Sequence, residues 1–199
     1  MISAIILAAG ESKRMGRPKQ LLSLGNQTVI QRVVDNFVNS KVDEVIVVLG
    51  FCWKEIEFSI QNKPIKTVLN KAYSNGMSSS IRKGLSSLSR ESDAFFIALG
   101  DQPLIKKDLI NMLIEKFENS KKGIIVPVFK GRRGHPVLFS SRYKKDFNIL
   151  KGDEGGKRIL YSNNEDILEA EVETETVLFD MDEKKDYEYI KSLFINKPA

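Results

Sequence analysis

The sequence predicts an α/β fold built on a mainly parallel, mixed β-sheet. Short apolar runs of strand length alternate with segments in which apolar residues recur at helical spacing. This alternation is typical of a parallel sheet that helices cover on both faces. No linker, repeat or low-complexity segment divides the 199 residues, of which 42% are hydrophobic. We therefore expect a single Rossmann-like domain over residues 1–199, with three α/β/α layers.

The expected strands and helices follow one another in chain order. Apolar runs predict strands at residues 4–8, 44–49, 66–69, 94–99 and 123–126, and later at 136–139 and 176–179. Helical spacing predicts helices at residues 30–37, 54–61, 77–88, 106–119, 142–150, 156–162 and 183–194. Thr28 is the expected N-cap of the first helix. The acidic stretch 165–175 is expected to be a solvated loop or an edge strand.

Composition and charge argue against several classes of protein. The net charge is +5, but basic and acidic residues are interleaved without an arginine-rich tract, so we expect no nucleic-acid binding. No apolar run approaches the roughly 20 residues that span a bilayer, and the N-terminus lacks the basic leader of a signal peptide. Cys52 is the only cysteine, so no internal disulfide can form, and we assign it no role. We expect a cytoplasmic protein without membrane contact.

The first expected strand opens into a loop that suits a phosphate group. The run from Leu7 to Gly10 is followed by a polar loop with Gly16 and with basic side chains at positions 13, 14, 17 and 19. Small residues let backbone N–H groups approach an anion, and Arg and Lys neutralise it. The spacing fits neither the Walker pattern nor the dinucleotide-binding fingerprint. We interpret the loop as a phosphate cradle of another kind, rather than as a loop with scattered surface charge.

Asp101 stands where a metal-bound polyphosphate would need a carboxylate. It follows Gly100 at the carboxyl end of the strand expected at 94–99. Ligands of open parallel sheets bind outside the carboxyl ends of the strands. Mg²⁺ usually takes one or two carboxylates together with substrate phosphates. The alternative is a turn aspartate that bonds its own backbone.

Asn70 and the Gly76–Ser80 segment form another candidate binding region. Asn70 ends an expected strand, and Gly76 leads into a helix whose N-terminus exposes free N–H groups. Ser79 and its serine neighbours are equally suited to cap that helix.

Three later segments also carry candidate residues. His135 lies in a glycine-rich, basic loop beside an expected strand. Asp153 and Arg158 flank glycines at the start of a helix, where Asp153 has the alternative role of N-cap. Asp180 and Asp182 alternate onto one face and could gather a divalent cation, although Asp182 could instead cap the last helix.

The loop sequence resembles the opening of nucleotidyltransferases of the molybdenum cofactor type. The matching run is Leu7-Ala8-Ala9-Gly10-x-Ser12-x-Arg14-Met15-Gly16-x-Pro18-Lys19-x-Leu21-Leu22. Its Ala-Ala-Gly form and Ser12 are most similar to the cytidylyltransferase branch. The later runs Asn…Gly-Met-x-Ser-Ser, Gly-Asp-Gln-Pro, Gly-His-Pro-Val, Gly-Asp-x-Gly-x-x-Arg and Asp-x-Asp also resemble that family. Together these matches extend from Ile5 to Tyr187.

The resemblance implies a reaction and a set of site residues. CMP would pass from CTP, or another nucleoside triphosphate, to the terminal phosphate of molybdopterin or the molybdenum cofactor, with Mg²⁺ as cofactor and release of pyrophosphate. The N-terminal half would bind the nucleotide and the C-terminal half the acceptor. The implied catalytic residues are Arg14, Lys19 and Asp101, and the implied metal ligands are Asp101 and Asp182. The implied nucleotide-binding residues are Leu7, Ala8, Ala9, Gly10, Ser12, Gly16, Asn70, Gly76, Ser79 and Gly100, and the implied acceptor-binding residues are His135, Asp153 and Arg158.

Two alternatives remain open at this point. A sugar-phosphate or alditol-phosphate nucleotidyltransferase would share the opening loop, although its acceptor half should lack the Gly-His-Pro-Val run. A non-catalytic maturation factor would bind nucleotide or cofactor and pass it to a molybdoenzyme, and an enzyme could also dock transiently to such a partner. The enzymatic interpretation requires Lys19 and Asp101 to converge on one polyphosphate.

Overall fold

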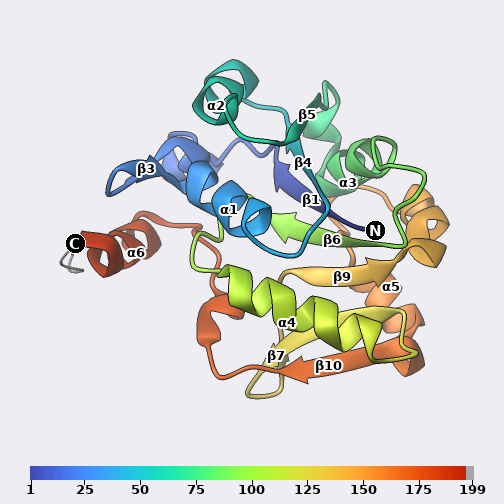
Figure 1. Ribbon diagram of the computed structural model, residues 1–199. Coiled ribbons are helices and arrows are strands. Elements are labelled where there is room, and N and C mark those ends of the chain that lie inside the picture. Colours follow the sequence, from blue (N-terminus) through green and yellow to red (C-terminus); the bar gives the residue numbers. More distant parts are fainter. Residues whose placement is uncertain (196–199) are drawn as a thin grey trace.

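The computed structural model describes residues 1–195, which form a mixed and mostly parallel sheet with helices on both faces (Figure 1). The expected fold class is confirmed. The strands of the main sheet, in spatial order, are β10 (Ile167–Glu171), β7 (Ile124–Phe129), β9 (Val137–Ser140), β6 (Ala94–Leu99), β1 (Ile2–Ala8), β4 (Glu44–Leu49) and β5 (Lys66–Leu69), and β8 (Arg132–Arg133) pairs with β7. A separate hairpin joins β2 (Ser23–Leu24) to β3 (Gln27–Thr28).

The centre of the sheet is parallel, which sets the place of the site. Strand β1 pairs in parallel with β4 on one side and with β6 on the other, whereas β9 runs antiparallel to both β6 and β7. Strands β1 and β6 are buried on both faces, as expected for near-continuous apolar runs. Because they run in the same direction, their carboxyl ends open at the same edge of the sheet.

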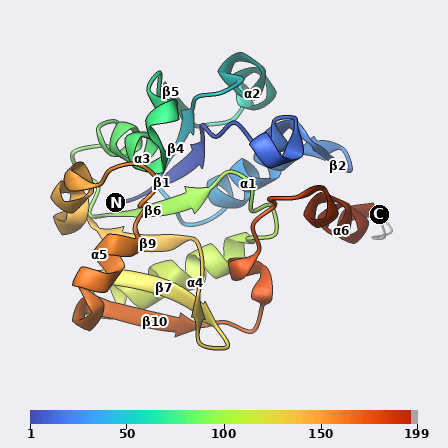
Figure 2. The same ribbon diagram turned by 180° about the vertical axis from the view of Figure 1, so that it is seen from behind.

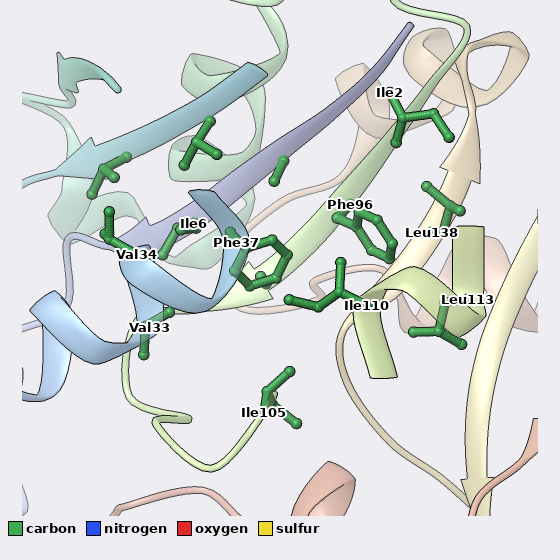
Figure 3. Packing of buried hydrophobic residues seen from close by; sticks show 14 of the residues in the cluster. Ile2, Ile6, Val33, Val34, Phe37, Phe96, Ile105, Ile110, Leu113 and Leu138 are labelled. Carbon is green, nitrogen blue, oxygen red and sulfur yellow. The ribbon is translucent and has the colours of Figure 1, made fainter. Parts of the chain in front are cut away.

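The helices divide between the two faces of the sheet (Figures 1 and 2). Their bounds are α1 (Val29–Val38), α2 (Trp53–Ile60), α3 (Met77–Leu85), α4 (Lys107–Glu118), α5 (Lys157–Ser162) and α6 (Lys184–Ile195). Helices α1, α2 and α4 pack into one apolar cluster, in which the rings of Phe37 and Phe96 meet edge to face at 5.9 Å near Ile110 (Figure 3). Helices α3 and α5 pack into a second cluster on the opposite face.

Helix α1 begins where the sequence predicts. The Thr28 hydroxyl accepts a hydrogen bond from the Gln31 backbone N–H at 3.3 Å, and the Gln31 side chain accepts one from the Thr28 N–H at 2.7 Å. This reciprocal capping box satisfies two donors that the first turn would otherwise leave free.

Helix α6 lies outside the two sheet-covering clusters and packs on the β2–β3 hairpin. A third apolar cluster joins Leu22 and Leu24 to Met181, Tyr187 and Ile190. The Tyr187 hydroxyl donates to the backbone carbonyl of Ser23 at 2.9 Å. This packing fixes the segment before α6 next to the first loop of the chain.

Part of the C-terminal half differs from expectation. Residues 176–179 do not form a strand, because Glu175–Leu178 is a 3₁₀ turn in which the Thr174 hydroxyl accepts from the Thr176 N–H. Residues 141–149 are helical as 3₁₀ turns rather than as an α-helix. The acidic stretch contains β10, so the edge-strand alternative is confirmed.

Candidate active site

The loops that follow β1 and β6 meet closely at the shared carboxyl edge. The Gly100 backbone N–H donates to the Leu7 carbonyl at 2.9 Å. A Cβ atom at Gly100 would lie 2.9 Å from that carbonyl oxygen and 3.1 Å from the Ala8 side chain. Glycine therefore permits the approach that brings Asp101 to the mouth of the first loop.

The first loop is shaped by two residues with left-handed backbone conformations. Ser12 has φ 55° and Gly16 has φ 66°, on either side of the 3₁₀ turn Lys13–Met15. The Ser12 hydroxyl accepts a hydrogen bond from the Lys19 backbone N–H at 3.2 Å. Ser12 therefore holds the loop closed and orients the residue that carries the ammonium group.

The expected catalytic and metal-binding side chains form one charge network. The Lys19 ammonium contacts the carboxylates of Asp101 and Asp182, at 3.0 Å from the latter, and Arg14 donates to Asp182 at 2.9 Å. The side chains of Lys19 and Asp101 are only 15% and 11% exposed. The sequence-based expectation that Lys19 and Asp101 converge is met.

Burial and charge act together on the pKa values of this network. Burial raises the pKa of the Asp101 carboxyl, although the Lys19 ammonium opposes this shift. Burial alone would lower the pKa of Lys19, but the contacts with Asp101 and Asp182 outweigh it and raise that pKa. Burial would likewise raise the pKa of Asp182, but Lys19 and Arg14 lower it. Lys19 is therefore held as a cation against partly desolvated carboxylates.

A cavity of about 340 Å³, here called the central cavity, opens above this network. The expected catalytic, nucleotide-binding and metal-binding residues in its wall are Leu7, Ala9, Gly10, Lys19, Gly76, Asp101 and Asp182, whereas Arg14 is not in the wall. The expected residues Ala8, Ser12, Gly16, Asn70, Ser79 and Gly100 are not in the wall and shape the loops around it. The wall also contains Asp180, which the sequence analysis paired with Asp182, and Gln20, Tyr73 and Ser80, which it did not assign.

Asn70 and Ser79 hold the base of α3. The Asn70 amide donates to the hydroxyls of Ser79 and Ser80 at 2.9 and 3.0 Å. None of the serines of this segment is the N-cap of α3, so the capping alternative is wrong. Instead Asp153 accepts from the Met77 N–H at 2.9 Å, and the Gly152 carbonyl accepts from the Ser78 N–H at 2.9 Å.

The same contacts correct two other capping alternatives. The carboxylate of Asp153 caps α3, while α5 begins after Gly156 without a side-chain cap. The carboxylate of Asp182 is bound by Arg14 and Lys19, and the N–H groups before α6 go to Asp186 instead. Asp153 thus ties the loop before α5 to the N-terminus of α3.

A second cavity of about 410 Å³, here called the side cavity, adjoins the first. The two share the wall residues Met77, Leu99, Asp153 and Asp180. The side cavity has apolar and aromatic walls from β6, β9 and α5, and glycines, basic side chains and acidic side chains also line it.

The expected acceptor-binding residues differ in how they lie at the side cavity. His135 is part of the wall, and its burial lowers the imidazole pKa, so the ring is neutral at pH 7. Its Nδ1 atom is buried, and no group among residues 1–195 forms a hydrogen bond with it. Arg158 is not in the wall and lies 3.9 Å from Glu154, whereas Lys157 is in the wall.

The donor set suits a divalent cation bound together with phosphate. Asp101 and Asp182 converge on a single atom, the Lys19 nitrogen. Among residues 1–195 no group of three or more His, Cys, Asp or Glu side chains is arranged to hold a metal by itself. Two carboxylates leave several coordination positions of Mg²⁺ for phosphate oxygens and water. A larger cavity of about 570 Å³, between α1, α4 and α6, contains none of these residues.

The described part of the chain contains no helix that is long and apolar enough to cross a membrane.

The chain is similar in sequence and structure to proteins that are already known. A probable molybdenum cofactor guanylyltransferase of Natranaerobius thermophilus is 33% identical over 152 residues, which cover 75% of this chain and 70% of that protein. The molybdenum cofactor cytidylyltransferase of Escherichia coli is 27% identical over 140 residues, 70% of each chain. The crystal structure of Rv0371c from Mycobacterium tuberculosis has a TM-score of 0.86 at 25% identity and covers 96% of this chain and 97% of that one. That protein has also been solved in complex with manganese.

The family match extends over most of the site. The model described as "MobA-like NTP transferase domain" matches residues 4–167, which include the first loop, Asp101 and the side-cavity loops, but not Asp182. This chain belongs to the MobA-like NTP transferase domain family.

Proposed function

We propose that this protein transfers CMP from CTP to the terminal phosphate of molybdopterin or the molybdenum cofactor, with Mg²⁺ as cofactor and release of pyrophosphate. The proposal also includes a nucleotide-binding N-terminal half, an acceptor-binding C-terminal half and a cytoplasmic location. The observation that carries it is the meeting of Lys19 with Asp101 and Asp182 in the wall of a cavity that adjoins a second one. Two adjoining cavities suit a reaction between two substrates.

The reaction needs no nucleophile or general base from the protein. The attacking group is the acceptor's phosphate, which is already an anion. The protein must hold two anionic substrates in line and neutralise the charge that develops on the α-phosphate and the leaving pyrophosphate. Lys19 and Arg14, together with N–H groups of the Ala9–Gly10 turn, are the groups that we assign to this task. A divalent cation held by Asp101 and Asp182 would add positive charge at the departing phosphates.

The side cavity supports an acceptor that carries both a flat ring system and a phosphate. Phe139 and Tyr161 line it with Leu160, and Lys157 provides positive charge in the same wall. Rings pack against aromatic and aliphatic side chains, and ammonium groups pair with phosphate. The neutral ring of His135 could exchange hydrogen bonds with a polar edge of such an acceptor.

The choice of CTP rests on the Ala-Ala-Gly form of the loop and on similarity to a cytidylyltransferase. A relative of higher identity is named as a guanylyltransferase. The test must therefore compare bases directly.

Purified protein should be incubated with molybdopterin, Mg²⁺ and each of the four nucleoside triphosphates in turn, and pyrophosphate release should be followed. We expect release with CTP and far less with GTP, ATP or UTP. Release with GTP alone would overturn the base assignment. Release with a sugar phosphate in place of molybdopterin would overturn the acceptor assignment, and binding of cofactor without any release would favour the maturation-factor alternative.

A further inference from the structure

The segment Asp180–Asp182 has no strand partner to hold it at the site. It follows the 3₁₀ turn Glu175–Leu178 and precedes α6, and Figure 2 shows it passing beside the loop that follows β6. Among the described residues, no backbone hydrogen bond joins this segment to β6 or to the first loop. Side-chain contacts therefore hold the segment in place: Met181 is buried in the cluster that joins α6 to the β2–β3 hairpin, and polar side chains reach toward Asp101.

Two polar side-chain links join this segment to the Asp101 side of the site. One is the Lys19 ammonium, which contacts both Asp101 and Asp182. The other is Gln102, whose side-chain amide donates to the Asp180 carboxylate at 2.7 Å. Gln102 is only 3% exposed, so its side chain is confined by packing. Asp180 is itself exposed and lies in the wall of both cavities.

Substrate binding should affect the two links differently. Under the proposed function, Lys19 turns toward phosphate oxygens, and its hold on the two carboxylates weakens. Asp101, Asp180 and Asp182 are like charges in one site and repel one another. The amide of Gln102 carries no charge that a phosphate would attract, so its bond to Asp180 can persist.

We propose that Gln102 is a positioning residue for the metal–triphosphate complex. By holding Asp180, it keeps Asp182 at a fixed spacing from Asp101, so that the two carboxylates share one divalent cation. The inference rests on the proposed function, since it requires a metal-bound triphosphate at this site. It assigns to Gln102 a role that is separate from contact with substrate.

The test uses CTP binding, measured by isothermal titration calorimetry at increasing Mg²⁺ and, separately, in EDTA. Gln102→Met keeps the length of the side chain but removes the donor. We expect it to raise the Mg²⁺ concentration for half-maximal CTP affinity about tenfold, the equivalent of about 1.4 kcal/mol. CTP affinity in EDTA should change less than about twofold, because the contacts of Lys19 and Arg14 with phosphate remain.

A polarity swap separates this role from simple destabilisation. Gln102→Glu alone places a carboxylate against Asp180. It should raise the Mg²⁺ concentration for half-maximal CTP affinity further than Gln102→Met does. Combined with Asp180→Asn, it restores one hydrogen bond with donor and acceptor exchanged and leaves the total charge of the pair unchanged. We expect the double variant to reach half-maximal CTP affinity at a Mg²⁺ concentration within about threefold of the wild-type value. Gln27→Met is the matched control, because it removes the same kind of bond outside the site. The Gln27 amide donates to the Asp35 carboxylate over 2.6 Å, and neither residue lines the central cavity.

The outcomes distinguish the two proposals. Equal losses of CTP affinity with and without Mg²⁺ in Gln102→Met, or a swap that fails to restore Mg²⁺ dependence, would overturn the positioning role alone. If Gln102→Met does not fold, the swap variant and Gln102→Asn give the same comparison. Wild-type protein that binds no triphosphate in either condition would contradict the proposed function, and the positioning role with it.

Discussion

Replacing Lys19 by methionine should destabilise the protein in a way that depends on pH. The change keeps most of the apolar stem and removes the ammonium that contacts Asp101 and Asp182. Asp101, which is 11% exposed, is then left without its partner. Asp182 is 46% exposed and also binds Arg14, so it contributes little to the loss.

The magnitude follows from the fate of the buried carboxyl. Removing one partner of a buried ion pair costs about 3–5 kcal/mol. Asp101 can limit this cost by taking up a proton, at about 1.4 kcal/mol for each pH unit between its pKa and the buffer. We therefore expect a loss of about 3 kcal/mol at pH 7.5, which lowers the unfolding temperature by roughly 6–12 °C for a chain of this size.

The sign of the pH dependence can be stated in advance. Without Lys19, the folded-state pKa of Asp101 rises further above its unfolded value, because burial no longer has an opposing charge. The unfolded chain then binds fewer protons than the folded one between the two pKa values, so stability falls as pH rises. The deficit should be small near pH 4 and largest above the variant's folded pKa.

Thermal unfolding of Lys19→Met, wild type and Lys41→Met at several pH values tests this reasoning. Lys41 lies 2.9 Å from Glu115, and both side chains are more than half exposed, so its loss should cost under about 1 kcal/mol at any pH. Adding Asp101→Asn to Lys19→Met should recover stability, since no unpaired charge remains. If Lys19→Met and Lys41→Met lose the same stability at every pH, the buried Asp101 carboxylate does not need the Lys19 charge. The electrostatic account of the site is then wrong.

Three further predictions concern the site and its walls. Asp101→Asn should keep the circular dichroism spectrum and lower nucleotidyl transfer about 10²–10³-fold, since the cation that neutralises the departing phosphates loses a charged ligand; near-normal turnover would refute its role. His135 is the single histidine, so proton NMR should give one imidazole titration with a pKa below 6.5, and stability should fall as pH drops from 6.5 through that pKa; a pKa at or above 6.5 would contradict its burial. Gly76→Ala should cost more than about 2 kcal/mol in urea unfolding, because φ is +92° and the Cβ would lie 2.4 Å from the Gly152 carbonyl carbon, whereas Gly131→Ala, with open space around it, should cost less.

The sequence predicts the centre of the site well, because parallel strands bring their carboxyl ends together. Strands β1 and β6 are parallel neighbours that end at Ala8 and Leu99, so the loops that carry Lys19 and Asp101 open at one edge. Asp182 is expected at the metal because its Asp-x-Asp run resembles that of the family, while the residues alone leave a helix cap as the alternative. Strand direction accounts for the placement of Lys19 and Asp101, and the family resemblance supplies the roles expected of all three residues.

Other features depend on partners that local sequence does not reveal. Residues 176–179 have strand-like composition, but β8, β9 and β10 already pair with β7, and Val177 instead turns into the core and accepts from the His135 N–H at 2.9 Å. Asp153 caps a helix that begins 76 positions earlier in the chain. Such contacts arise from tertiary packing, which periodicity cannot report.

Tyr73 and Gln102 were missed for a related reason. Tyr73 lies between the assigned positions Asn70 and Gly76, but nothing in its type or spacing distinguishes a cavity residue from a packed aromatic. Gln102 adjoins Asp101, and the role that we propose for it depends on a hydrogen bond to Asp180, 78 positions away in the chain. In both cases the residue is recognised only by what lies next to it in the folded structure.

The most direct test of the account follows the α-phosphate itself. Purified protein should be given Mg²⁺, molybdopterin and CTP labelled at the α-phosphorus, and the label should be traced by chromatography. We predict that label passes to the pterin in equal amount with released pyrophosphate, and that Asp101→Asn abolishes most of the transfer. Label that stays in CTP, with intact cofactor and folded protein, would contradict the proposal that this cavity transfers a nucleotide.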